Sequence, residues 1–183
     1  MRNLLTILFD AFVEIVRRLA EIEFILYGGR HNKPQPLRRF QFRLMGVSIK
    51  GKAFIGNGTY IRCRKNLFLG DRCSLGGFIK IWNYAPVHIG ADFLAAPNVV
   101  INAGTHDILT LEPGATEIRI GDRVWVGANC TILAGVTIGD DVVIAAGSLV
   151  NKDVPSNSIV AGVPARWIRS IDRSNIKIWT PFT

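Results

Sequence analysis

His106 is the residue best placed to do chemistry, because it lies where a regular pattern in the sequence breaks down. An exposed imidazole has a pKa of about 6.5, so it can accept a proton near neutral pH and act as a general base. A histidine in a surface loop can equally be solvated and inert, and the residues alone leave both interpretations of His106 open. We interpret His31 and His88 as solvated or structural side chains.

The broken pattern is an aliphatic residue at every sixth position. It runs without exception over residues 120–150, and residues 49–101 follow the same period with two shifts of two residues. Continuing the count would place Asp107 and Pro113 at positions meant for buried aliphatics. We therefore expect residues 106–117 to leave the repeat as a loop, with the histidine at its root and Asp107 capping it.

A period of six is typical of neither a helix nor an alternating strand. It arises when a short strand and a tight turn form one side of a triangular coil, and successive coils stack at about 4.8 Å. We assign Gly121, Gly127 and Gly139 to turns with positive φ, and Cys73 and Cys130 to small buried positions at the corners. The flat outer faces carry several aromatic residues, so self-association around a three-fold axis would cover them.

Residues 1–46 precede the repeats. Apolar residues recur at helical spacing between Leu5 and Leu26, which predicts an amphipathic helix that ends at the glycines of "YGGR". The segment has too many charges to span a bilayer. Two interpretations stay open: packing on protein, or contact with a membrane surface, with the basic connector at residues 30–43 facing anionic lipid.

The net charge of +8 is unevenly distributed. Residues 1–70 contain thirteen Lys/Arg and four Asp/Glu, whereas residues 71–183 contain nine and ten, so the basic character is local and does not indicate a nucleic-acid partner. Three cysteines without metal-ligand spacing favour reduced thiols in a cytoplasm. Without a recognisable secretory signal, we expect a cytoplasmic protein, with the inner face of the membrane as a further location.

Two stretches resemble a known enzyme family. "IGADFLAAPNVVINAGTHD" is similar to the segment before the catalytic histidine of galactoside and maltose O-acetyltransferases, and "VWVGANCTILAGVTIGDDVVIAAGSLVNKDVPSNSIVAGVPARWIR" is similar to their acetyl-CoA-binding coils and closing strand. Polysaccharide acetyltransferases of the colanic-acid type also begin with an extra N-terminal segment. The resemblance implies an all-β fold, a left-handed parallel β-helix over residues 47–165, between the N-terminal region 1–46 and a C-terminal tail 166–183.

The resemblance also implies a homotrimer that transfers acetyl from acetyl-CoA to a sugar hydroxyl without a metal, in the biosynthesis of a surface polysaccharide such as exopolysaccharide, capsule or O-antigen. His106 matches the catalytic base, and the backbone N–H of Ala128 matches the donor to the thioester carbonyl. The residues matched to coenzyme binding are Trp125, Ala128, Ala146, Asn151, Lys152, Arg166 and Arg169.

One departure from the family concerns the acceptor. Gly76 replaces an asparagine that orients the acceptor, and Asn83 and Tyr84 replace an acidic pair that contacts it. A simple galactoside is therefore not supported, and we expect Asn83 and Tyr84 to contact a different sugar.

Three other functions stay open from the sequence. The first is N-acetylation of an amino-sugar nucleotide, or acetylation of serine, because such enzymes share the fold and the donor. The second is a γ-type carbonic anhydrase with three histidines on zinc, although His31 precedes the repeats. The third is a non-catalytic trimeric scaffold, against which the complete set of coenzyme-matching residues argues.

Overall fold

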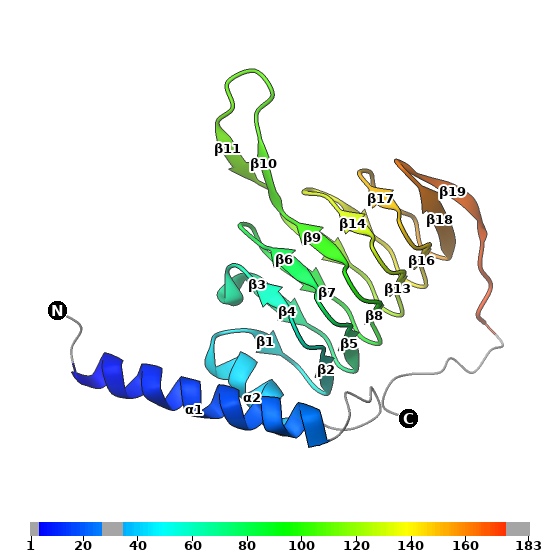
Figure 1. Ribbon diagram of the computed structural model, residues 1–183. Helices are drawn as coiled ribbons and strands as arrows, with labels where there is room; N and C mark the ends of the chain where they lie inside the picture. The colour runs from blue at the N-terminus through cyan, green and yellow to red at the C-terminus, as the bar shows by residue number, and fades with distance from the viewer. Residues whose placement is uncertain (1–3, 27–34, 175–183) are drawn as a thin grey trace.

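The computed structural model describes residues 4–26 and 35–174, and it consists of two helices followed by a parallel β-helix (Figure 1). Most strands are two or three residues long, and successive strands pass through three faces of a prism. Apart from two antiparallel hairpins, each strand pairs in parallel with the equivalent strand of an adjacent coil. The architecture expected from the period of six is therefore confirmed.

The faces are named in the order in which the chain enters them. Face 1 contains β1 (Ser48–Ile49), β4 (Leu67–Leu69), β7 (Val87–Ile89), β12 (Ile118–Ile120) and β15 (Thr137–Ile138). Face 2 contains β2 (Ala53–Ile55), β5 (Cys73–Leu75), β8 (Leu94–Ala95), β13 (Trp125–Val126), β16 (Val143–Ile144), β18 (Ser158–Gly162) and β19 (Ala165–Ser170). Face 3 contains β3 (Tyr60–Ile61), β6 (Lys80–Trp82), β9 (Val100–Asn102), β14 (Thr131–Ile132) and β17 (Leu149–Val150).

The repeated aliphatic residues point into the prism and stack on one another. On face 3 the column runs through Ile61, Ile81, Ile101, Ile132 and Val150, and all five are buried. Removing such a side chain from water contributes about 1.5–3 kcal/mol, so the columns are the main stabilising feature of the fold.

Both shifts in the period and the interruption fall on the same edge, between faces 3 and 1 (edge 3–1). The first shift adds the 3₁₀ turn η1 (Arg64–Asn66), and the second adds the corner at residues 83–86. The interruption adds a hairpin of β10 (Gly104–His106) and β11 (Pro113–Ala115), which projects from the prism in Figure 1. The other two edges, 1–2 and 2–3, keep short corners throughout.

The expectation that the repeat glycines take positive φ was wrong. Gly121, Gly127 and Gly139 all have ordinary φ, and non-glycine residues such as Asn129 adopt the left-handed conformation at the turns. The glycines are needed because the next coil lies against them: a Cβ on Gly127 would lie 2.5 Å from the backbone nitrogen of Ala146. Glycine is required at these positions because of the short distance between coils, and not because of the turn conformation.

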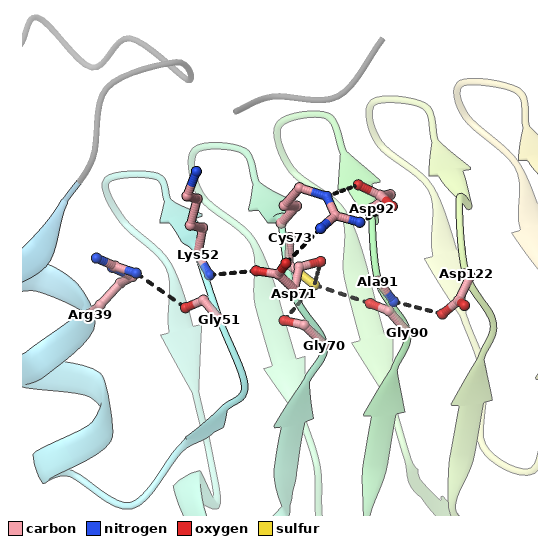
Figure 2. A network of polar contacts seen from close by, with 11 residues as sticks. Arg39, Gly51, Lys52, Gly70, Asp71, Cys73, Gly90, Ala91, Asp92 and Asp122 are labelled. Atoms are coloured by element: carbon pink, nitrogen blue, oxygen red, sulfur yellow. Dashed lines mark hydrogen bonds and ion pairs between the residues drawn. The ribbon is translucent and has the colours of Figure 1, made fainter. Parts of the chain in front are cut away.

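Edge 1–2 is held by acidic side chains that bond the preceding coil (Figure 2). The Oδ1 atom of Asp71 accepts the backbone N–H of Lys52 at 2.7 Å, and that of Asp122 accepts the N–H of Ala91 at 2.7 Å. Arg72 connects Asp71 to Asp92 through bonds of 2.6 to 2.7 Å. Asp71, Arg72, Asp92 and Asp122 on this edge therefore connect the coils of the fold.

The two corner cysteines have the structural role expected of them. Cys73 and Cys130 are buried free thiols, and burial raises the pKa of Cys73 to about 12. Such a thiol stays protonated at neutral pH and does not act as a nucleophile.

The N-terminal segment forms α1 (Leu4–Leu26) and α2 (Pro36–Leu44). The expectation of a basic connector is wrong for its second half, because Pro36 starts a short amphipathic helix that buries Arg38 and Phe42 over the first coil. Helix α1 packs on α2 through Val16 and Ala20 and lies across the N-terminal end of the prism (Figure 1).

The long side of α1 that does not meet α2 is apolar and exposed. Its exposed residues include Leu8, Phe12, Ile15, Leu19 and Ile22. Among the residues that the structure describes, no helix combines the length and apolarity needed to cross a bilayer. The "YGGR" stop and His31 lie outside the described residues, and the expected C-terminal tail begins instead inside strand β19.

Candidate active site

His106 lies on the hairpin that leaves edge 3–1. It ends β10, opposite Pro113 of β11, and its side chain is exposed. Beyond it, the Oδ1 atom of Asp107 accepts the backbone N–H groups of Thr110 (2.8 Å) and Leu109 (2.9 Å), and these bonds lower the pKa of Asp107. Asp107 therefore closes the tip of the hairpin, as expected, and does not orient the imidazole.

A hollow of about 480 Å³ opens between the hairpin and the prism. His106, Trp82, Tyr84 and Asn102 are among the residues that line it. Gly104 lets the hairpin approach so closely, since a Cβ there would lie 2.7 Å from the Tyr84 ring. The hollow is large enough for a sugar ring, and among the described residues that line it, His106 is the only one of a type that commonly serves as a general base.

Tyr84 and Asn83, the two residues expected to contact the acceptor, differ in their exposure. Tyr84 is 48% exposed and lines the hollow. Asn83 is fully buried: its Oδ1 accepts the N–H of Cys63 at 2.9 Å, and its Nδ2 donates to the carbonyl of the same residue. The expected contact between Asn83 and an acceptor is therefore wrong, because its amide is used to join two coils.

The structure also explains the departure at Gly76. A Cβ at this position would lie 2.8 Å from the backbone of the next coil, at Ala95, Ala96 and Pro97. This chain therefore has no room for the asparagine of the sugar acetyltransferases. Trp82 and Asn102 take up the wall of the hollow instead, and sequence reasoning missed both as site residues. The sequence marks Trp82 only as one of several aromatic residues expected on the outer faces.

Part of the coenzyme-matching set gathers at the C-terminal end of the prism. Asn151, Lys152 and Arg166 line a second hollow of about 280 Å³, together with Trp167, which the sequence did not suggest. Arg169 lies further along β19, opposite Ile159, and is exposed.

The other matching residues lie elsewhere. Trp125 is 49% exposed on face 2. Ala128 and Ala146 occupy successive corners of edge 2–3, and the carbonyl of Ala128 accepts the N–H of Gly147 at 2.8 Å. Within the described part of the chain, the N–H of Ala128 donates to no other group, so it is available to a ligand.

His106 and Ala128 are not brought together within one chain. His106 follows face 3 on edge 3–1, whereas Ala128 precedes face 3 on edge 2–3. The expected base and the expected oxyanion donor thus lie at opposite borders of one face. Within residues 4–26 and 35–174, no group of three His, Cys, Asp or Glu side chains is placed to hold a metal ion.

Comparison with known proteins agrees with the β-helix fold. Residues 117–152 match the family model described as bacterial transferase hexapeptide (six repeats). The chain is 32% identical to galactoside O-acetyltransferase of Escherichia coli (strain K12), over 81% of this chain and 76% of that protein. It is 32% identical to a putative colanic acid biosynthesis acetyltransferase of the same organism, over 72% and 74%.

A solved structure of a galactoside acetyltransferase in complex with coenzyme A superposes with a TM-score of 0.73 at 30% identity, covering 91% of this chain and 86% of that one. The prism is thus the left-handed parallel β-helix of these enzymes. The chain therefore belongs to the hexapeptide-repeat acetyltransferase family and is an acetyl-CoA-dependent O-acetyltransferase.

Proposed function

We propose that this enzyme O-acetylates a sugar of a surface polysaccharide, with His106 as the general base. The observation that supports this most directly is the hollow at the hairpin, where the imidazole of His106 and the rings of Trp82 and Tyr84 line one space that fits a sugar. The relatives named for galactoside and colanic acid acetylation support a glycan acceptor.

In the proposed reaction, a sugar hydroxyl bound in the hollow attacks the thioester carbonyl of acetyl-CoA, and His106 removes the hydroxyl proton. The backbone N–H of Ala128 stabilises the negative charge on the tetrahedral carbonyl oxygen, which is worth on the order of 3 kcal/mol for one such donor. Collapse forms the ester and expels the thiolate, which takes the proton back from the imidazolium. Acetyl passes directly between the two substrates, so no residue is acylated.

The test is replacement of His106 by Ala and by Asn, with thiol release from acetyl-CoA measured on hydroxyl and amine acceptors. We expect kcat to fall by about 10²–10⁴, the usual contribution of a general base, with coenzyme affinity and unfolding temperature unchanged. Turnover that survives both substitutions would contradict the assignment, and a preference for amine acceptors would favour N-acetylation.

The second hollow is proposed to hold the phosphates of the coenzyme. Lys152 and Arg166 both line it, and cationic side chains on exposed edges suit phosphate groups. Replacing both by Gln is expected to raise KM for acetyl-CoA by at least about tenfold, since one lost charge-assisted contact is worth about 1.5–3 kcal/mol, with kcat little changed. An unaltered KM would remove these residues from the coenzyme site.

We also propose that a homotrimer assembles the complete site. Since His106 and Ala128 lie on different edges, a thioester can reach both only where two copies meet. The outward row on face 2, which contains Leu94, Trp125, Val143 and Ile159, is apolar and suits such an interface. We propose that the pantetheine arm of the coenzyme runs along edge 2–3 past Ala128 and Ala146, so an Ala146→Phe variant should block this channel.

Mixing denatured Ala146→Phe and His106→Ala chains and refolding them together tests this arrangement. Sites shared between copies should recover part of the activity, because some combine an intact histidine with an open channel. A site within one chain would give no recovery.

Finally, we propose that the protein is cytoplasmic and that α1 rests on the membrane surface. The exposed apolar side of α1 and its position across the end of the prism suit a helix lying in the lipid interface. Binding to anionic liposomes should be lost when Leu8 and Leu19 are replaced by Glu. Equal binding of both proteins would favour a protein partner for α1.

A further inference from the structure

The wall of the hollow facing His106 continues down edge 3–1 into the preceding coil. Arg62 lies with its guanidinium carbon 5.8 Å from the centre of the Tyr84 ring. The side-chain amide of Asn66 donates to the backbone oxygens of Asn83 (3.3 Å) and Tyr84 (3.2 Å), which fixes one corner against the next. The corner at residues 62–66 is therefore stacked directly beside the wall of the site.

This corner is cationic and its charges are not compensated. Arg62, Arg64 and Lys65 are exposed, and within the described residues none of them forms an ion pair. The sequence contains no Asp or Glu from Phe24 to Gly70. No carboxylate lines the hollow at His106 among the described residues either.

The arginines of edge 1–2 show the contrast. Arg72 bonds Asp92 and Asp71, and Arg123 bonds Asp141. Each of these two arginines thus has an acidic partner. The three at residues 62–65 have none, and they lie on the edge that carries the catalytic hairpin.

We infer that the acceptor is an anionic saccharide: one sugar stacks on Trp82 and Tyr84 beneath His106, and its negative group binds Arg62, Arg64 and Lys65. The inference rests on the proposed function. Aromatic rings favour apolar sugar faces, and Arg and Lys favour carboxylate or phosphate. Two coils separate the hairpin from the cationic corner, a distance of about 10 Å, which is near the length of a disaccharide.

The position of the cationic corner also sets the direction in which the acceptor would bind. The cationic corner lies in the first coil, next to the end of the prism where α1 and α2 pack. A saccharide bound this way points its charged end toward the N-terminal end of the molecule. A phosphate that links the glycan to a carrier would fit this arrangement, and so would the carboxylate of an acidic sugar.

The test uses three disaccharides: neutral maltose, maltose 1-phosphate and digalacturonate. Calorimetric titration gives Kd without requiring turnover, and thiol release gives kcat/KM. We expect at least one anionic disaccharide to bind about tenfold more tightly than maltose, which is about 1.4 kcal/mol, and the preference to shrink with added salt. The anion that gains most identifies carboxylate or phosphate as the recognised group.

The variant for this test is R62Q/R64Q/K65Q, and its matched control is K50Q/K52Q, two exposed lysines in the same coil on edge 1–2. The triple variant should bind all three disaccharides alike, with an unchanged unfolding temperature, while the control keeps the preference. Equal binding by the wild type, or equal loss in both variants, would overturn the inference. If anions bind but no acetyl is transferred, the proposed function fails and the anion site stands.

Discussion

Replacing Asn83 by Ala separates a structural role for this residue from the acceptor contact that the sequence suggested. Its amide makes two hydrogen bonds to the backbone of Cys63, one as acceptor and one as donor, and the side chain is fully buried. Alanine would leave both backbone groups of Cys63 without these partners. At about 1 kcal/mol for each bond, we expect a loss of about 2 kcal/mol in the free energy of unfolding.

The assay is thermal unfolding at fixed protein concentration, with kcat/KM measured well below the transition. For a chain of this size, about 2 kcal/mol corresponds to a decrease of about 4–8 °C in the unfolding temperature. Asn57→Ala is the control, because Asn57 is an exposed residue on edge 2–3. An unchanged unfolding temperature combined with a lower kcat/KM would refute the structural role and restore Asn83 as an acceptor ligand.

Asn83→Asp adds a pH signature to the same prediction. The aspartate could still accept the N–H of Cys63, but its second oxygen would face the Cys63 carbonyl, which disfavours ionisation and raises its folded pKa. A raised pKa means that the cost is small below the unfolded value of about 3.9 and grows as the pH rises through the folded value. The difference from the wild type should therefore widen between acid and neutral pH.

Two other predictions concern the stacking of the coils. Gly127→Ala should cost about 1–3 kcal/mol of stability, because the new Cβ would lie 2.5 Å from the nitrogen of Ala146. Gly77→Ala should be tolerated, because the nearest neighbour of its new Cβ would be 3.5 Å away. Equal unfolding temperatures for the two variants would contradict the close-packing argument. Asp141→Asn should lower stability at pH 7 by about 1 kcal/mol, since the hydrogen bond to Arg123 holds the pKa of Asp141 below its usual value. That stabilisation is present above the pKa of Asp141 in the unfolded chain and is lost as the pH falls through its pKa in the folded protein. Denaturant unfolding at pH 7 and in acid should therefore show that the difference in stability between wild type and variant disappears at low pH.

The local pattern of this sequence was sufficient for the triangular coil and for the position of the hairpin. A six-residue period directs the same side of every strand inward. Because every coil repeats this pattern, the prism follows from the spacing of the aliphatic residues. The hairpin follows because Asp107 and Pro113 cannot replace buried aliphatics. His106 was proposed as the base for the same reason, since it directly precedes Asp107, although the hairpin begins two residues earlier at Gly104.

The tertiary structure decided what depends on contacts between coils. The sequence suggested Asn83 as a ligand, but its side chain is buried and bonds the backbone of Cys63 in the preceding coil. It also suggested Gly127 as a turn residue, but glycine is required there because Ala146 of the next coil lies against it. The separation of His106 from Ala128 across a face is likewise a property of the stacked chain. A one-dimensional pattern specifies which side chains point inward, but the distances between coils determine which of the remaining groups are free to meet a substrate.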